Sequence, residues 1–167
     1  MSKTKLQIIG SGHLGVYTAK KLNAELYPGR LEDFPGHNGI VLNMAGKTDL
    51  SWCEANQEEA TFVNSKAPAI AYAATQNKGG KFLHISSACV WNGSFRADGY
   101  PFEPNEPPTP ACHYAATKAK GDEFLFNLYE RQKDLAILRP RMPYSPVNSN
   151  RNLLSKLRGY EKLIDDP

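Results

Sequence analysis

Three glycines that follow a short apolar run constrain the fold of this chain more than any other feature of its sequence. The apolar run covers 5–9 and leads into Gly10-Ser11-Gly12-His13-Leu14-Gly15, after which apolar residues recur at helical spacing from 16 to 24. Glycine permits a turn too tight for a residue with a β-carbon, and it lets the next helix pack closely on the strand. The segment therefore predicts a strand, a tight turn and a helix.

Apolar runs typical of buried strands alternate with helical spacing along the rest of the chain. Strands are predicted at 39–45, 81–86 and 135–138, with a long helical stretch between the first two and a Pro-rich loop at 101–110 before a helix at about 111–131. Such alternation favours a parallel sheet covered by helices on both faces. We predict an α/β fold built on a Rossmann-like, doubly wound parallel sheet.

Two finer predictions concern the segments on either side of the strand at 39–45. The segment before Val41 is too short for the two strands and the helix that usually follow the first helix of such a fold, so the sheet is predicted to be abbreviated there, with one short strand at 25–27. In the helical stretch after the strand, Ser51 and Glu54 have the spacing of a capping box. An apolar stripe in that stretch comprises Phe62, Ala67, Ile70, Ala71 and Ala74.

Composition and charge exclude several classes of protein. A chain of 167 residues suits one domain, and its 20 basic and 17 acidic residues form no basic block of the kind that binds nucleic acid. No apolar run approaches the roughly 18 residues of a membrane span. Three cysteines without a CxxC pair indicate neither a disulfide framework nor a zinc site. We expect a cytoplasmic protein without a metal, a nucleic-acid partner or a membrane contact.

The glycine segment has the spacing G-x-G-x-x-G at the junction of a strand and a helix. At such a junction the backbone can approach a pyrophosphate closely, and the helix N-terminus attracts its charge, so the segment predicts a dinucleotide cofactor. The alternative is a glycine-rich turn without a ligand. The acidic residue expected for the ribose is not clearly marked, because Glu32 and Asp33 lie beside Arg30 without a clear strand. Arg30 could meet a 2′-phosphate, which favours NADP and leaves NAD open.

Tyr114 and Lys118 are four residues apart and therefore share one face of a helix. A cation near a phenol lowers its pKa, so that the phenol can pass a proton to a carbonyl oxygen. The same spacing occurs at 17 and 21 and at 129 and 133, so spacing alone does not identify the pair. Tyr114 differs because it begins a helix after a loop and because a strand ending near Ser87 lies upstream. We predict Ser87, Tyr114 and Lys118 as a set of reacting residues.

These residues resemble those of the extended short-chain dehydrogenase/reductases, and within them the dTDP-4-dehydrorhamnose reductases and the nucleotide-rhamnose synthases, which are 3,5-epimerase/4-keto-reductases. The resemblance runs through most of the chain. The matching segments are 29–31, 42–46, 49–54, 63–64, 114–118, 138–143 and 150–156.

The resemblance implies a role for each matching residue. Tyr114 would be the proton donor, Ser87 would complete the catalytic triad, and Lys118 would hold the nicotinamide ribose. The residues implied to surround the cofactor are Gly10, Gly12, His13, Leu14, Gly15, Arg30, Ala45, Gly46 and Asn64. The implied activity is the NAD(P)H-dependent reduction of a nucleotide-linked 4-keto-6-deoxy sugar, in rhamnose-type nucleotide-sugar synthesis.

Two further positions match the epimerase/reductases. Cys89 falls where these enzymes carry a cysteine acid/base, and Lys156 matches the second acid/base of the rhamnose synthases. The resemblance therefore implies an epimerisation role for this pair, against the plainer interpretation of a packed thiol and a surface lysine.

The chain also departs from the family pattern. Its glycine loop is one residue shorter than the usual G-x-x-G-x-x-G, and it stops at Pro167, where relatives continue into a substrate-binding region. We expect one dinucleotide-binding domain over 1–167, with the substrate-binding region starting at about 143–167 and most of it absent. The alternative to an enzyme is a non-catalytic dinucleotide-binding or regulatory subunit of the same fold. A homodimer is compatible with either.

Overall fold

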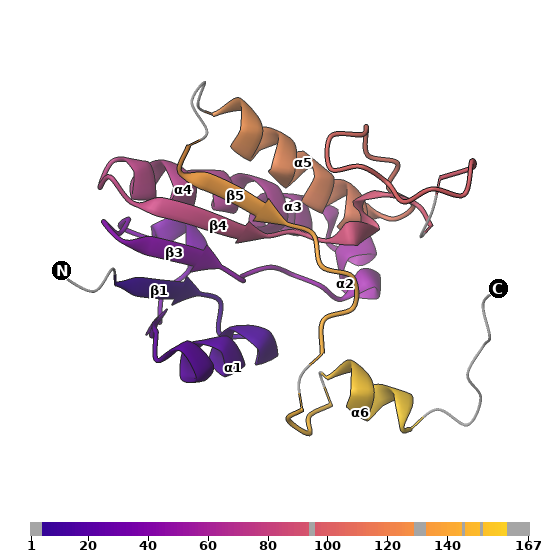
Figure 1. The fold of residues 1–167 in the computed structure, drawn as a ribbon, viewed down its shortest axis with the longest axis horizontal. Helices are drawn as coiled ribbons and strands as arrows, with labels where there is room; N and C mark the ends of the chain where they lie inside the picture. The colour runs from indigo at the N-terminus through magenta and orange to yellow at the C-terminus, as the bar shows by residue number, and fades with distance from the viewer. Residues whose placement is uncertain (1–4, 94–95, 129–132, 145, 151, 160–167) are drawn as a thin grey trace.

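A five-stranded parallel sheet forms the centre of the molecule in the computed structural model, which describes residues 5–93, 96–128, 133–144, 146–150 and 152–159. The strand order is β2-β1-β3-β4-β5, and every neighbouring pair is parallel. The strands are β1 (Leu6–Ile9), β2 (Glu25–Tyr27), β3 (Ile40–Asn43), β4 (Lys81–Ile85) and β5 (Leu135–Leu138). The predicted α/β fold is confirmed (Figure 1).

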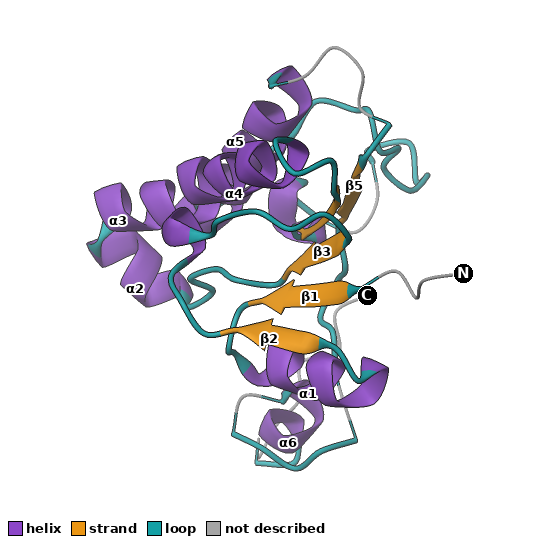
Figure 2. Ribbon diagram, turned by 90° about the vertical axis from the view of Figure 1, so that its left-hand side faces the viewer, coloured by secondary structure: helices purple, strands orange, loops and turns teal. Residues whose placement is uncertain are grey.

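Helices cover both faces of this sheet, as a doubly wound fold requires. Figure 2 shows α1 and α6 on one side of the sheet and α2 to α5 on the other. The helices are α1 (His13–Leu22), α2 (Leu50–Ala55), α3 (Gln57–Thr61), α4 (Ala67–Gln76), α5 (His113–Asn127) and α6 (Leu153–Leu157). The end predicted for α5 at Arg131 lies outside the described residues. Within the described ranges, no helix is both long and apolar enough to span a bilayer.

Successive residues of β1 and β3 supply two separate cores, because side chains alternate across a sheet. Ile9 and Val41 join the larger core under α4 and α5, together with Tyr72 and Leu125. Ile8, which precedes Ile9, and Leu42, which follows Val41, point to the other face. There they form a smaller core with Ala19 of α1 and partly buried apolar neighbours. The near-continuous apolar runs in the sequence therefore reflect burial on both faces.

The abbreviation predicted before β3 is present. A single 3₁₀ turn at Leu31–Asp33 stands between β2 and β3. Leu31 and Phe34 are almost fully buried in the larger core, and the turn packs against α4. The chain thus crosses from β2 to β3 with few residues, two of which complete the core.

The helical stretch between β3 and β4 is broken rather than continuous. Asp49, not the predicted Ser51–Glu54 pair, caps α2, because its carboxylate accepts a hydrogen bond from the Trp52 N–H (2.7 Å). The Glu54 carboxylate instead accepts from the N–H of His113, the first residue of α5 (2.7 Å). Asn56 interrupts the helix, and the capping-box prediction was wrong because a tertiary partner claims Glu54.

A π-helical segment at Phe62–Lys66 joins α3 to α4. Asn64 and Ser65 of this segment are fully buried and hydrogen-bond to Thr117 of α5 (3.0 and 2.8 Å). Gly121 lets α5 come this close, since a β-carbon there would lie 2.5 Å from the Asn64 carbonyl oxygen. The predicted stripe was wrong at Ile70, which is 43% exposed on the outer side of α4.

Candidate active site

The glycine loop contains two glycines that the fold requires and one that it does not. A β-carbon on Gly10 would lie 2.6 Å from the backbone nitrogen of Ala45, and one on Gly15 would lie 1.9 Å from the Gly10 carbonyl oxygen. Gly10 also has a φ of +115°, which L-residues rarely adopt. A β-carbon on Gly12 would meet no atom of the described residues within 4 Å. Gly12 therefore keeps space open rather than allowing the chain to pack.

That open space belongs to a cleft of about 760 Å³ at the carboxyl ends of β1 and β3. Its lining residues are Gly12, His13, Leu14, Gly15, Met44, Gly46, Lys47, Thr48, Asp49, Trp52 and Lys156. Ligands of open α/β sheets bind at this position, where the strand order reverses. The sequence did not single out Lys47 and Trp52, although the Lys47 ammonium lies 4.3 Å from the centre of the Trp52 ring. The signal for Lys47 is its position four residues after the end of β3, where ligands of parallel sheets bind.

The chemistry of this cleft fits a dinucleotide. The first turn of α1 contains no acidic side chain, and its N-cap residue, Gly12, has no side chain that could block a ligand. Lys47 and Lys156 add positive charge to the lining. A helix N-terminus of this kind attracts phosphate through its backbone N–H groups and its dipole.

The three predicted reacting residues come together at the end of β4 and the start of α5. Ser87 follows β4, and its hydroxyl accepts a hydrogen bond from the Cys89 N–H (3.2 Å). Tyr114 is the second residue of α5, and its side chain hydrogen-bonds to that of Ser87. Burial raises the pKa of the Tyr114 phenol, and the Ser87 bond opposes this rise. The phenol is therefore protonated at neutral pH and can act as a proton donor.

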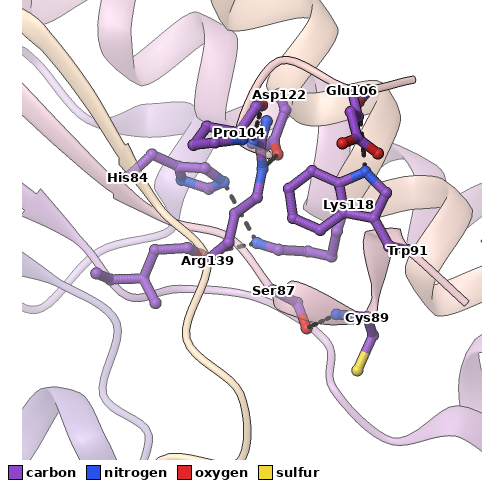
Figure 3. Close-up of polar contacts among 10 residues, drawn as sticks. His84, Ser87, Cys89, Trp91, Pro104, Glu106, Lys118, Asp122 and Arg139 are labelled. Carbon is purple, nitrogen blue, oxygen red and sulfur yellow. Dashed lines mark hydrogen bonds and ion pairs between the residues drawn. The ribbon is translucent and has the colours of Figure 1, made fainter. Parts of the chain in front are cut away.

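Lys118 lies one turn further along α5 and points into the sheet (Figure 3). Only 3% of its surface is exposed, and its ammonium nitrogen donates to the Ile85 carbonyl (2.9 Å). Burial lowers its pKa to about 8, against an opposing effect of Asp122. The lysine also lies 3.3 Å from His84 Nε2, and the other ring nitrogen of His84 lies 3.0 Å from the Asn43 amide nitrogen. Sequence reasoning did not select Asn43 or His84, because both lie inside apolar strand runs.

A buried ion pair fixes the loop beside the reacting residues. Arg139, just after β5, donates through Nε to Asp122 of α5 (2.7 Å) and through Nη1 to the Pro104 carbonyl (2.7 Å). Its guanidinium lies 5.0 Å from the centre of the Trp91 ring. Figure 3 draws both side chains. Burial raises the pKa of Asp122, and the Arg139 hydrogen bond opposes the rise. The pair ties the Pro-rich loop to the end of the sheet.

Asn64 links the cleft to the reacting residues through its carboxamide. Its Oδ1 accepts from the Lys47 N–H (2.9 Å), and its Nδ2 donates to the Lys47 carbonyl (2.9 Å) and to the Thr117 hydroxyl (3.0 Å). Lys47 lines the cleft, and Thr117 precedes Lys118. Asn64, which the sequence predicted beside the cofactor, thus connects the glycine-loop cleft with the helix that carries Tyr114 and Lys118.

The remaining predicted residues occupy different places. Cys89 is exposed in the turn after Ser87 and adds to the rise in the pKa of Tyr114 that burial causes. Lys156 of α6 lines the glycine-loop cleft, whereas Cys89 and Tyr114 are not among the described residues that line it. Arg30 follows β2 with a mostly exposed side chain that forms an ion pair with Glu32.

Residues 30–162 match the RmlD substrate binding domain family, so the glycine loop precedes the matched region. The dTDP-4-dehydrorhamnose reductase of Mycobacterium tuberculosis is 31% identical over 84 residues, which are 50% of this chain and 28% of that protein. The bifunctional dTDP-4-dehydrorhamnose 3,5-epimerase/dTDP-4-dehydrorhamnose reductase of Arabidopsis thaliana is 28% identical over 137 residues, 80% of this chain and 44% of that protein.

A solved structure gives the same fold. The crystal structure of dTDP-4-dehydrorhamnose reductase from Bacillus anthracis in complex with NADP aligns with a TM-score of 0.75 at 22% identity, over 95% of this chain and 60% of that chain. The chain therefore spans less than two thirds of each of these relatives. Because the family match covers most of its residues, this chain belongs to the RmlD substrate binding domain family.

Proposed function

We propose that this chain carries the dinucleotide site and the proton donor of an NADPH-dependent reductase that acts on a nucleotide-linked 4-keto-6-deoxy sugar. The observation that carries the proposal is the contact of Tyr114 with Ser87 beside the buried Lys118, at the end of β4. The glycine-loop cleft lies at the ends of the neighbouring strands β1 and β3. A cofactor and a donor can therefore meet at one edge of the sheet.

The glycine loop and the N-terminus of α1 would hold the pyrophosphate of the cofactor, with His13, Leu14, Ala45 and Gly46 against its flanks. NADPH, when bound, supplies hydride to a keto carbon. Support for NADP comes from Arg30 at the end of β2, where a 2′-phosphate would lie, and from the NADP in the Bacillus anthracis relative. NAD remains the alternative cofactor.

Tyr114 would give its proton to the keto oxygen while Ser87 holds that oxygen by a hydrogen bond. The raised pKa of the phenol keeps it protonated before the reaction. Lys118, four residues along the same helix, would bind the nicotinamide ribose and stabilise the phenolate that the reaction leaves.

Cys89 and Lys156 would serve an epimerisation that precedes reduction. A carbon beside the 4-keto group is acidic, because Ser87 and Tyr114 can stabilise the enolate oxygen that forms when its proton leaves. A base removes this proton on one face of the sugar ring, and an acid returns a proton on the other face. The exposed Cys89 thiol beside Ser87 and the Lys156 side chain at the glycine cleft are the two candidates. Their separate positions require the sugar ring to lie between them.

The test supplies NADPH and a nucleotide-linked 4-keto-6-deoxyglucose in deuterated water, and follows both NADPH oxidation and deuterium in the product. The full proposal expects oxidation together with deuterium at the epimerised carbons, and expects Cys89→Ala to abolish that exchange. An already epimerised substrate should still be reduced by Cys89→Ala. Exchange that persists in both Cys89→Ala and Lys156→Ala would remove the epimerase assignment and leave a plain reductase.

The second candidate is a non-catalytic dinucleotide-binding or regulatory subunit. The observation that favours it is that Tyr114 and Cys89 are not among the described residues that line the glycine-loop cleft. Binding of NADPH without turnover would identify it. The domain division near 143–167, the homodimer and the cytoplasmic location stay predictions.

A further inference from the structure

Asn43, His84 and Lys118 form a hydrogen-bonded row inside the sheet that the proposed reaction does not fully use. Asn43 and His84 are completely buried, and Lys118 is 3% exposed. The row runs from the end of β3 through β4 to α5, so it connects the strand below the glycine cleft with the lysine beside Tyr114. Its donors and acceptors can be assigned one by one.

Asn43 fixes the direction of the row. The Ala45 N–H donates to Asn43 Oδ1 (3.0 Å), which identifies that atom as the oxygen and leaves Nδ2 facing His84 Nδ1 (3.0 Å). An amide nitrogen only donates, so His84 Nδ1 must accept and carries no proton. The neutral imidazole then has its proton on Nε2.

The proton on Nε2 faces Lys118 Nζ at 3.3 Å. An ammonium group has three donors and no acceptor, so a protonated Lys118 would set a donor against a donor. A free amine accepts from His84 through its lone pair and still donates to the Ile85 carbonyl (2.9 Å). To accept an ammonium, His84 would have to move its proton to Nδ1, which breaks its bond with Asn43.

The charged and titratable groups around Lys118 do not reverse the preference for its free amine over its ammonium form. Asp122, one turn further along α5, favours the ammonium, but its carboxylate is engaged by Arg139 at the end of β5. Burial lowers the pKa of His84 well below its ordinary value, with Lys118 adding to the effect, so the imidazole stays neutral. Tyr114, one turn before Lys118, is itself neutral because burial raises its pKa.

We propose that Asn43 and His84 are positioning residues that favour the free-amine form of Lys118 through a fixed Nε2–H tautomer of His84. The consequence for catalysis rests on the proposed function. If the ammonium stabilises the Tyr114 phenolate, the reduction rate falls as pH rises through the titration of Lys118. Removing His84 then moves that fall to higher pH.

The test reads the two groups directly by NMR on the whole chain without cofactor. Nitrogen-15 spectra of the histidine rings report the tautomer of His84, and carbon-13 labelling at lysine Cε reports the titration of Lys118, with His84→Phe and Lys118→Met providing the assignments. We expect a neutral Nε2–H tautomer at every pH at which the chain is folded. In His84→Phe the Lys118 titration should move upward by about half to one pH unit, as expected for the loss of one hydrogen bond.

His37→Phe is the matched control, because His37 Nδ1 also accepts a hydrogen bond, in its case from the Gly39 N–H, but lies outside the site. It should leave the Lys118 titration unchanged. Asn43→Asp should also raise that titration, since a carboxylate would draw the proton to Nδ1 and let Nε2 accept from the ammonium. An Nδ1–H tautomer or an imidazolium in the wild type would overturn the proposal even if His84→Phe fails to fold, and so would an unmoved titration in a folded His84→Phe.

The result is independent of turnover. If the spectra are as expected but the chain does not oxidise NADPH, the roles of Asn43 and His84 stand, and the proposed function is contradicted. If the chain does turn over, the alkaline limb of its rate profile should move upward in His84→Phe by the same interval as the NMR titration. A rate profile that does not follow the titration would separate Lys118 from the chemical step.

Discussion

The two halves of the site are built in opposite ways. At the glycine loop, the important feature is the absence of a side chain: Gly12 borders an open cleft, and no atom in the described part of the chain lies within 4 Å of where its β-carbon would be. At the reacting residues, buried side chains are held by specific partners, and Lys118 is 3% exposed. A phosphate is recognised by backbone and space, whereas proton transfer requires fixed, desolvated groups.

The largest expected effect falls on the reacting half. Tyr114→Phe removes the proton donor, so the rate of NADPH oxidation should fall by about 10²- to 10⁴-fold, while NADPH affinity changes by less than about twofold. Turnover measured at saturating NADPH, together with a binding titration, separates the two quantities. Unchanged turnover in Tyr114→Phe would take this residue out of the mechanism.

The next effect concerns the ion pair that supports the reacting half. Arg139→Met leaves the buried Asp122 carboxylate without its partner, and the free energy of unfolding should fall by about 3–5 kcal/mol. Arg141→Met is the matched control: this exposed arginine bonds only to the Gly93 carbonyl among the described contacts and should cost less than about 1 kcal/mol. If denaturant unfolding shows equal losses of unfolding free energy in the two variants, the buried ion pair does not stabilise the fold more than an exposed contact does.

The glycine loop offers a sharper contrast within one short segment. Gly15→Ala forces a β-carbon against the Gly10 carbonyl and should reduce stability by about 1–3 kcal/mol. Gly12→Ala should change stability by less than about 0.5 kcal/mol yet weaken NADPH binding by about tenfold or more, because the methyl group enters the cleft. Thermal unfolding and NADPH titration of both variants check this, and unaltered affinity in a folded Gly12→Ala would contradict it.

The same contrast explains what the sequence could predict. The glycine loop, the alternating strands and Tyr114 with Lys118 are local patterns, each confined to a few neighbouring positions. His84 looked like one more strand residue, because its partner Asn43 lies 41 positions away. The bonds that hold the helical stretch after β3 against α5, from His113 to Glu54 and from Asn64 to Thr117, likewise join residues more than 50 positions apart. Tertiary hydrogen bonds of this range leave no mark in local spacing.

The most direct measurement is the melting temperature of the chain against NADPH concentration. A ligand that binds only the folded state stabilises it by about 2.7 kcal/mol at a hundred times its dissociation constant. We predict a melting temperature that rises continuously with NADPH, and a rise displaced to higher concentration in Gly12→Ala. Equal melting temperatures with and without millimolar NADPH would contradict the assignment of the glycine-loop cleft as a dinucleotide site.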